Sequence, residues 1–359
     1  MSLYQLHSKI GPTIVHEGNE LLYFSGTSYL GIAANKAFEK LVILGIQQYG
    51  ISHGLSRINN VRLAVYEQFE NFFAEKAGSE KALALSSGFL AGQAAIQHLA
   101  NQADHMFIAP DTHPAILPPY TSTKNSYEKS WEEHCKITCE QLPPQRILII
   151  ANSVNPLTPE IYDFSWIAHL PRTHRYTLLL DDSHAFGIVG SSIFGTFNRW
   201  KYLPVELVVS GSLGKALGIP AGIVLGDQST LLNISRESLF RTSSPPSPAF
   251  LYAFLKAQDI YQEALEILKN NNRFFFNLIQ NNKSLYGSVD YPVYTFKNRN
   301  WVKQLEDKGI VVSSFPYPDL TDPWTNRIVI SAFHEEEELL LLHKVLSQLH
   351  REPDYSLKT

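Results

Sequence analysis

Two stretches of the sequence combine residue types that could support covalent chemistry. In residues 178–187 (LLLDDSHAFG) an apolar run ends in two aspartates, a serine and a histidine. In residues 207–218 (LVVSGSLGKALG) an apolar run ends in a Gly/Ser turn that presents a lysine. Both patterns indicate buried strands with polar groups at their carboxyl ends, where open α/β sheets bind ligands. A carboxylate and a lysine on neighbouring strand ends suit a cofactor with an aldehyde and a ring nitrogen. The lysine can form a Schiff base with the aldehyde, and the carboxylate can keep the ring nitrogen protonated.

The elements that must position these residues follow a strand–helix alternation. The pattern predicts two early helices, at residues 35–49 and 63–77, the second ending at Gly78, a residue that favours helix termination. The predicted strands then recur with helices between them: 82–85, 106–109, 146–151, 176–180, 205–209 and 222–226. Such alternation predicts a mostly parallel sheet with right-handed crossovers.

The regular alternation of strands and helices ends in the last third of the chain. Residues 248–281 read as one long helical region leading away from the sheet. Three predicted strands (293–296, 310–315 and 327–331), a helix at 299–307 and a closing helix at 335–350 follow. We therefore expect an N-terminal segment at 1–50, a large domain at 51–260 and a small α+β domain at 261–359.

Composition narrows the class of protein further. The chain has 359 residues, 44% hydrophobic and 18% charged, which is ordinary for a globular protein of one large and one smaller domain. The net charge is −4 and no basic block is dense, so we expect no nucleic-acid or membrane partner. No secretory signal or membrane-spanning run is apparent, and we expect a cytoplasmic protein.

The two cysteines do not indicate a metal centre. Cys135 and Cys139 lie four residues apart, next to His134. No further ligands occur at the spacing of a zinc site, so two free thiols and no metal are expected.

A third motif has the pattern of an anion site. The predicted strand at 82–85 is followed by Ser86, Ser87, Gly88 and Phe89 and then a helix. A helix N-terminus after a turn of small residues presents free N–H groups to a phosphate. Taken alone, this motif is more often an ordinary helix cap.

Six motifs occur in one order along the chain: SSGF, DTHP, DDSHAFGIVG, SGSLGKALG, RTSSPPSP and RIVISAFH. Together they resemble the α-oxoamine synthases, a branch of the fold-type I enzymes that use pyridoxal 5′-phosphate. The resemblance runs from about residue 21 to 345. It implies an α/β fold, with a mostly parallel seven-stranded sheet between helices in a large domain and a small α+β C-terminal domain. It also implies an amino acid and an acyl-CoA as substrates, and a homodimer with shared active sites.

The same resemblance implies roles for individual residues at the cofactor ring. Lys215 is the implied Schiff-base lysine, and Asp181 the implied partner of the pyridine nitrogen. His184 is implied near the 3′-oxygen of the ring, and His113 on the ring face. These four residues are the candidate catalytic group.

Further residues are implied at the two ends of the bound molecule. The cofactor phosphate would be held by loop and helix-end residues: Ser87, Gly88, Phe89 and Ser212 of one chain, with Thr242 and Ser243 of the partner subunit. The carboxylate of the amino acid would be held by Arg327, whose planar guanidinium matches its geometry.

Some positions differ from the family pattern. Ser28 stands where the family has asparagine, Tyr66 where it has histidine, and Pro156 where a serine bonds the cofactor 3′-oxygen. Asn155 could make that bond instead, because the turn at 152–156 (NSVNP) is similar to one in class I aminotransferases. Arg57 matches an arginine of the family loop, and with Ser28 it joins Arg327 as a candidate substrate-binding residue.

Three functions therefore remain open. The first is an acyl-CoA:amino-acid C-acyltransferase, as the resemblance implies. The second is an aminotransferase or another cofactor-dependent lyase on the same scaffold, which Asn155 favours. The third is a non-catalytic cofactor-binding protein, against which the intact Lys215 argues.

Overall fold

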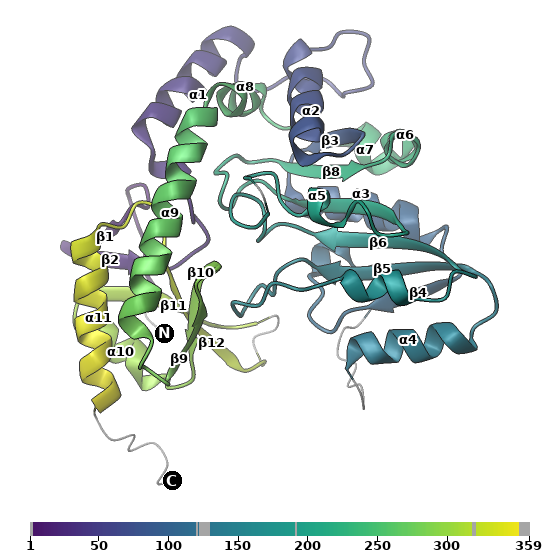
Figure 1. Cartoon of the computed structure of the whole chain (residues 1–359). Coiled ribbons are helices and arrows are strands. Elements are labelled where there is room, and N and C mark those ends of the chain that lie inside the picture. The colour runs from purple at the N-terminus through teal and green to yellow at the C-terminus, as the bar shows by residue number, and fades with distance from the viewer. Residues whose placement is uncertain (1–2, 120, 122–129, 191, 318–320, 352–359) are drawn as a thin grey trace. The chain divides into compact units, whose positions relative to one another are not determined.

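The computed structural model describes residues 3–119, 121, 130–190, 192–317 and 321–351. It divides into two compact units, which we describe separately. One unit comprises Lys36–Pro156 and Ile161–Ile260, and the other Met1–Asn35, Leu157–Glu160 and Tyr261–Thr359. Both units combine a sheet with helices, which confirms the α/β class (Figure 1). Among the described residues, no helix has both the length and the apolar composition needed to cross a membrane.

The first unit is built on a six-stranded sheet. Its order is β3 (Lys81–Leu85), β8 (Gly222–Gly226), β7 (Glu206–Ser212), β6 (Arg175–Asp181), β5 (Arg146–Asn152) and β4 (His105–Ile108). Strands β4 to β7 pair in parallel, whereas β8 pairs antiparallel with both β7 and β3. The mostly parallel sheet is therefore confirmed.

The number of strands in this sheet differs from the expectation. The six strands correspond to the six apolar runs in the sequence, whereas a seventh was expected only from the family resemblance. The described residues contain no seventh strand in this sheet. The connection from β4 to β5 includes residues 122–129, which lie outside the described part of the chain.

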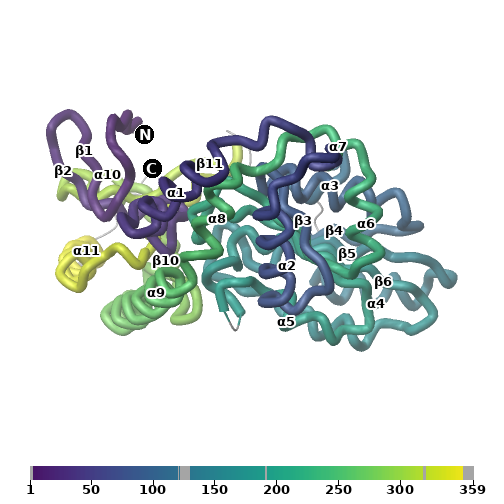
Figure 2. Tube along the Cα trace, turned by 90° about the horizontal axis from the view of Figure 1, so that it is seen from above, coloured from purple at the N-terminus to yellow at the C-terminus, as the bar shows by residue number. Residues whose placement is uncertain are grey.

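Helices cover both faces of the sheet or pack at its ends. Their bounds are α1 (Lys36–Tyr49), α2 (Ala64–Ala77), α3 (Gly88–Ala100), α4 (Trp131–Gln141), α5 (Phe197–Trp200), α6 (Gln228–Arg236), α7 (Ser238–Thr242) and α8 (Pro248–Lys256). The predicted helices at 35–49 and 63–77 are confirmed, and α2 ends at Gly78 with a φ of 79°. Helix α1 packs against α8 (Figure 2). Both cysteines are buried free thiols on α4.

Helix α3 lies on the face of the sheet that carries the candidate site. Its inner side consists of small residues, and Ala91, Ala94 and Ala95 are almost fully buried against Leu179 and Val208 of the sheet. Small side chains allow the helix axis to approach the strands closely. This close approach brings the N-terminus of α3 to the end of β7.

The long helical region predicted at 248–281 is in fact two helices. Helix α8 ends at Lys256. The next residue, Ala257, has a φ of −104° and a ψ of 20°, which are not helical, and α9 (Gln258–Ile279) begins directly after it. The amide group of Gln258 donates to the Phe254 carbonyl oxygen at 2.6 Å, replacing a helical backbone bond there. Hydrophobic periodicity is uninterrupted at this point, so the sequence pattern alone could not show the break.

The second unit contains a sheet of six mostly antiparallel strands. Its order is β1 (Thr13–His16), β2 (Asn19–Phe24), β11 (Ile310–Pro316), β12 (Trp324–Val329), β10 (Tyr291–Phe296) and β9 (Leu285–Ser288). Among the described strands of this sheet, only β2 and β11 pair in parallel. Helices α9, α10 (Asn300–Glu306) and α11 (Glu336–Arg351) complete the unit, with a core that includes Phe24, Phe275, Ile328 and Leu346. The predicted α+β character of the C-terminal region is therefore present, and the N-terminal hairpin joins its sheet.

His334 is a buried residue that links separate segments of this second unit. Its Nδ1 accepts a hydrogen bond from the Ser331 N–H at 3.0 Å, and its Nε2 lies 3.0 Å from the Tyr23 carbonyl oxygen. The ring also stacks on Phe24 at 4.1 Å. Because Nδ1 accepts, the neutral ring carries its proton on Nε2. Burial lowers the pKa of His334 to about 4, although the bond to Tyr23 opposes the shift.

We expect this histidine to make the protein less stable in acid. The unfolded chain binds a proton at its ordinary pKa of about 6.5, whereas the folded ring does so only near 4, so stability is lost as pH falls through that window. Between pH 7 and pH 4.5 the loss should be about 2 kcal/mol in the free energy of unfolding. Urea titrations of the wild type and of His334→Gln at both pH values test this. An equal loss in both proteins would contradict it.

Candidate active site

The site is built on the carboxyl ends of β6 and β7. Asp181 is the last residue of β6, pairs in register with Ser210 of β7, and is only 6% exposed. Its Oδ1 accepts a hydrogen bond from the Ser183 N–H at 2.7 Å. The Ser183 hydroxyl in turn accepts from the Ser212 N–H at 2.8 Å, which ties the turn after β6 to the end of β7. The two motifs singled out in the sequence are thus bonded to each other.

The neighbouring carboxylate, Asp182, has a structural role. It is fully buried and accepts hydrogen bonds from the Thr196 N–H at 2.6 Å, from the Thr196 hydroxyl at 2.8 Å and from the Ser153 hydroxyl. Burial raises the pKa of Asp182 to about 6 even though these donors favour the ionised form. Asp182 therefore anchors the strand end, and Asp181 is the carboxylate that remains for a ligand.

His113 lies close enough to both Asp181 and Lys215 to feel their charges. The His113 Nδ1 is 3.8 Å from the Asp181 Oδ2. The pKa of His113 is lowered, first by burial and also by the positive charge of Lys215, while Asp181 opposes the shift. Nδ1 also accepts from the Ala115 N–H at 3.1 Å, so the neutral ring carries its proton on Nε2. The structure thus brings together a carboxylate, a lysine and a neutral imidazole with a defined tautomer.

His184 lies in the turn that follows β6. This turn is closed by bonds from the Ala185 and Phe186 N–H groups to the Asp182 carbonyl oxygen, both at 2.8 Å. The His184 side chain is half-buried there. Its role near the cofactor ring stays a prediction.

The expected phosphate end is formed by α3 and the end of β7. Ser87 caps α3, and its hydroxyl accepts from the Leu90 N–H at 3.1 Å. A Cβ on Gly88 would lie 2.5 Å from the Cα of Ser212, so only glycine permits this approach. The first N–H groups of a helix have no partner within it, which suits a phosphate. The backbone of Ser87–Gly88 beside Ser212 therefore fits the phosphate of pyridoxal phosphate, with Phe89 exposed at its edge.

The two residues expected to reach a neighbouring subunit lie at the end of α7. Thr242 is exposed, and its hydroxyl donates to the Ser238 carbonyl oxygen at 2.7 Å. Ser243 follows, half-buried, with its hydroxyl 3.4 Å from the Phe240 carbonyl oxygen. Their part in a shared site stays a prediction.

Sequence reasoning missed a hydrogen-bonded frame behind His113. Asn152, the last residue of β5, accepts from the His113 N–H at 3.0 Å and donates to the Asp111 carbonyl oxygen at 2.6 Å. Tyr162 donates to the Asp111 carboxylate at 2.7 Å and accepts from the Asn155 amide at 2.9 Å. Asp111, Asn155 and Tyr162 line a cavity of about 450 Å³. The polar end of β5 was a signal for Asn152, whereas nothing in the sequence marked Tyr162.

Arg57 is held by the fold of its own unit. Both ends of its guanidinium donate to Glu70 at 2.8 Å, and it lies over the Tyr66 ring at 4.8 Å. Burial alone would lower the pKa of Arg57, but the bonds to Glu70 outweigh it and the pKa is raised. Glu70 also accepts from the Ala84 N–H at 2.7 Å, which links the loop before α2 to β3. A substrate-binding role for Arg57 stays a prediction.

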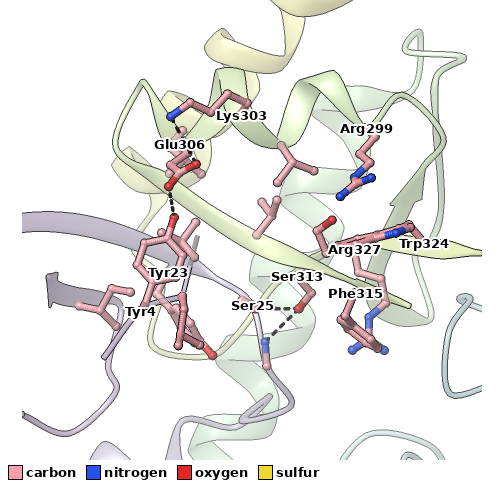
Figure 3. A pocket seen from close by; sticks show the side chains of 18 of the residues that line it. Tyr4, Tyr23, Ser25, Arg299, Lys303, Glu306, Ser313, Phe315, Trp324 and Arg327 are labelled. Carbon is pink, nitrogen blue, oxygen red and sulfur yellow. Dashed lines mark hydrogen bonds and ion pairs between the residues drawn. The ribbon is translucent and has the colours of Figure 1, made fainter. Parts of the chain in front are cut away.

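The other two candidate substrate residues, Ser28 and Arg327, belong to the second unit. Arg327 lies on β12 and is only 5% exposed, with its guanidinium 5.2 Å from the Phe315 ring (Figure 3). It lines a cavity of about 760 Å³ together with Ser313 and Arg299. The cavity combines apolar walls with cationic side chains, which suits a ligand that has a carboxylate. The roles of Ser28 and Arg327 stay predictions.

The parallel sheet, with an acid, a lysine and a histidine at its carboxyl edge, defines an α/β enzyme of fold type I. The family described as Aminotransferase class I and II matches residues 19–346. The chain therefore belongs to the class I and II aminotransferase family, and its relatives confirm the resemblance to the α-oxoamine synthase branch.

Two of those relatives carry the same name. The chain is 26% identical to the 8-amino-7-oxononanoate synthase of Petrotoga mobilis, over 94% of this chain and 91% of that protein. It is also 26% identical to the protein of that name from Thermosipho melanesiensis, over 93% and 89%.

Solved structures share the fold. Serine palmitoyltransferase from S. paucimobilis superposes with a TM-score of 0.83 at 16% identity, covering 97% of this chain and 92% of that one. The 8-amino-7-oxononanoate synthase of Francisella tularensis gives 0.71 at 19% identity, covering 92% and 97%.

We expect Arg57→Ala to destabilise the protein by about 3–5 kcal/mol, because it would leave Glu70 buried without its counter-charge. Chemical denaturation of the variant measures this. The double variant Arg57→Met/Glu70→Gln is the control, and it should recover much of the loss because no charge is then buried alone. If Arg57→Ala kept its stability and only weakened substrate binding, the ion pair would not be structural.

Proposed function

We propose that this protein is a pyridoxal-phosphate-dependent C-acyltransferase that condenses an amino acid with an acyl-CoA, releasing carbon dioxide and CoA to give an α-amino ketone. Among known activities it is most similar to 8-amino-7-oxononanoate synthase. The proposal depends above all on one observation: His113, which follows β4, is within reach of the charges of Asp181, at the end of β6, and of Lys215, which follows β7. The curated relatives of that name, aligned over most of the chain, support it.

Pyridoxal phosphate, when bound, supplies an electron sink for negative charge at the α-carbon of the amino acid. Lys215 would hold the aldehyde carbon covalently, and Asp181 would keep a proton on the ring nitrogen. His113 would face the ring, and His184 and Asn155 would bond its oxygen. Ser87, Gly88, Phe89 and Ser212 would hold the phosphate.

The residues of this chain would then move protons and orient charges. The Lys215 amine, once released from the cofactor, is the base that takes the α-proton of the amino acid. The lowered pKa of His113 keeps its ring neutral near pH 7, so that Nε2–H can donate a hydrogen bond to a developing oxyanion. Asp181, fixed by the Ser183 N–H, stays in place while charge develops above it. Arg327 would hold the carboxylate of the amino acid.

A homodimer in the cytoplasm completes the proposal. Thr242, exposed at the end of α7, and Ser243 would reach the phosphate site of the partner subunit. Ser28 and Arg57 would help shape the substrate site. Two buried free thiols agree with a reducing compartment.

The second candidate function is that of an aminotransferase. Asn155 favours it, because its amide is held in a defined orientation by Tyr162. The residues after Lys215, Ala216 and Leu217, do not favour it, because aminotransferases often place a phosphate-binding arginine there.

One experiment separates the two functions. The purified protein is mixed with glycine, L-alanine or L-serine and a panel of acyl-CoA thioesters, and thiol release is followed. Release that needs one pair of substrates supports the acyltransferase. Conversion of the cofactor to its pyridoxamine form by an amino acid alone, without thiol release, would favour the aminotransferase.

We expect Lys215→Ala to abolish turnover and the visible absorption band of the bound cofactor, since this amine is both the attachment point and the base. Lys201→Ala, which removes a surface lysine of the same unit, should retain both. Borohydride reduction followed by mass spectrometry gives an independent readout. Cofactor that remained covalently attached in Lys215→Ala would refute the assignment.

A further inference from the structure

The hairpin after β5 carries a tyrosine that the proposed chemistry does not use. Tyr162 is fixed by a bond from its N–H to the Ser153 carbonyl oxygen at 3.0 Å, and Val154 and Ile161 pair across the hairpin. This pairing places the Tyr162 hydroxyl next to the side chain of Asn155, seven residues earlier. The same hydroxyl also contacts the side chain of Asp111, which follows β4.

The direction of each hydrogen bond in this group can be assigned. An ionised carboxylate only accepts, so the Tyr162 hydroxyl must donate to the Asp111 Oδ2, 2.7 Å away. The Tyr162 oxygen is then left to accept, and the group that donates to it is the Asn155 Nδ2 at 2.9 Å. The carboxylate thus determines, through the tyrosine, that one N–H of the Asn155 Nδ2 is directed at the Tyr162 oxygen.

The same carboxylate residue is connected to the catalytic histidine. The Asn152 Nδ2 donates to the Asp111 carbonyl oxygen at 2.6 Å, and the Asn152 Oδ1 accepts from the His113 N–H at 3.0 Å. Asn155 and His113 are therefore joined by one frame that runs through Tyr162, Asp111 and Asn152. If the residues at one end of this frame moved, those at the other end would therefore move as well.

The other charges that line this cavity are already engaged. Glu132 pairs with Lys136 at 2.6 Å, and Asp163 accepts from the Ser165 N–H at 2.9 Å. On the cofactor side, Asp181 and Lys215 act electrostatically on His113. Asp111 is thus the carboxylate of the frame itself.

We propose that Tyr162 is a positioning residue for the cofactor: by accepting one N–H of the Asn155 Nδ2, it orients the amide so that the second N–H of the same nitrogen bonds the ring oxygen of pyridoxal phosphate. The inference rests on the proposed function, because it requires that cofactor and the predicted role of Asn155. It goes beyond that function by assigning a task to a residue that touches neither substrate nor cofactor.

Tyr162→Phe removes only the hydroxyl and tests the proposal. A hydrogen bond to the ionised ring oxygen favours the ionised form, so losing its orientation should raise the pH at which the cofactor's visible absorption band titrates. We expect a rise of about half to one pH unit, the value of one hydrogen bond, and a cofactor dissociation constant about fivefold larger. Spectral titration and equilibrium dialysis measure the two quantities.

Tyr176→Phe is the matched control. It removes another buried tyrosine hydroxyl of the same unit, one that donates to the Pro171 carbonyl oxygen at 3.0 Å and takes no part in the frame. This variant should leave both quantities unchanged. Asn155→Ala should raise the titration midpoint as Tyr162→Phe does, and the double variant should add little, because both changes remove the same bond.

The outcomes separate the two proposals. A wild-type protein that binds no pyridoxal phosphate would refute the proposed function. A wild type that binds it, with a Tyr162→Phe variant whose titration midpoint and cofactor affinity are unchanged, would overturn the role of Tyr162 alone. Loss of thermal stability without either shift would also overturn that role, since it would show a purely structural tyrosine.

Discussion

The site depends on the way two adjacent carboxylates are separated at the end of one strand. Side chains alternate between the faces of an extended backbone, so Asp181 and Asp182 point to opposite sides of the sheet. Asp182 is fully buried on one side, fixed by Thr196 and Ser153. Asp181 is thereby held on the other, the side covered by α3. The two acids are equivalent in the sequence, whereas the fold makes Asp182 a structural anchor and leaves Asp181 at the candidate site.

Hydrogen bonds between loops hold the residues of the candidate site in place at this strand end. The Ser183 hydroxyl, bonded to the Ser212 N–H, fixes the turn after β6 to the strand that leads to Lys215. On the other flank, Asn152 at the end of β5 holds the backbone of His113. Parallel strands bring their carboxyl ends to one edge, but side-chain bonds of this kind determine the positions of the loops that follow them.

Helices and strands could be predicted from the sequence where their burial produces a hydrophobic pattern in consecutive residues. The central strands are apolar runs because both faces of a parallel sheet are covered, and all six were predicted. Helices α1 and α2 were predicted from their periodicity. The short strand β9 was missed because it lies at the sheet edge with a half-exposed pattern, and the break at Ala257 leaves the periodicity intact. Asp181, Lys215 and His113 could be found from strand ends and motifs. Tyr162 could not, because its partner Asp111 lies 51 residues away and only the folded sheet brings them together.

Two departures from the family pattern can be followed in the structure, one at Pro156 and one at Tyr66. Pro156 lacks the hydroxyl that the family pattern places at the cofactor oxygen, and Asn155 beside it carries an amide bonded to Tyr162. Tyr66 replaces a histidine, and its hydroxyl donates to the Pro246 carbonyl oxygen while its ring lies under Arg57. A chain that had lost its chemistry would be free to lose such residues without replacement. Here Asn155 and Tyr66 both have polar partners with good geometry, and a buried polar group without partners would be costly. Asn155 and Tyr66 are thus built into the fold by hydrogen bonds of their own.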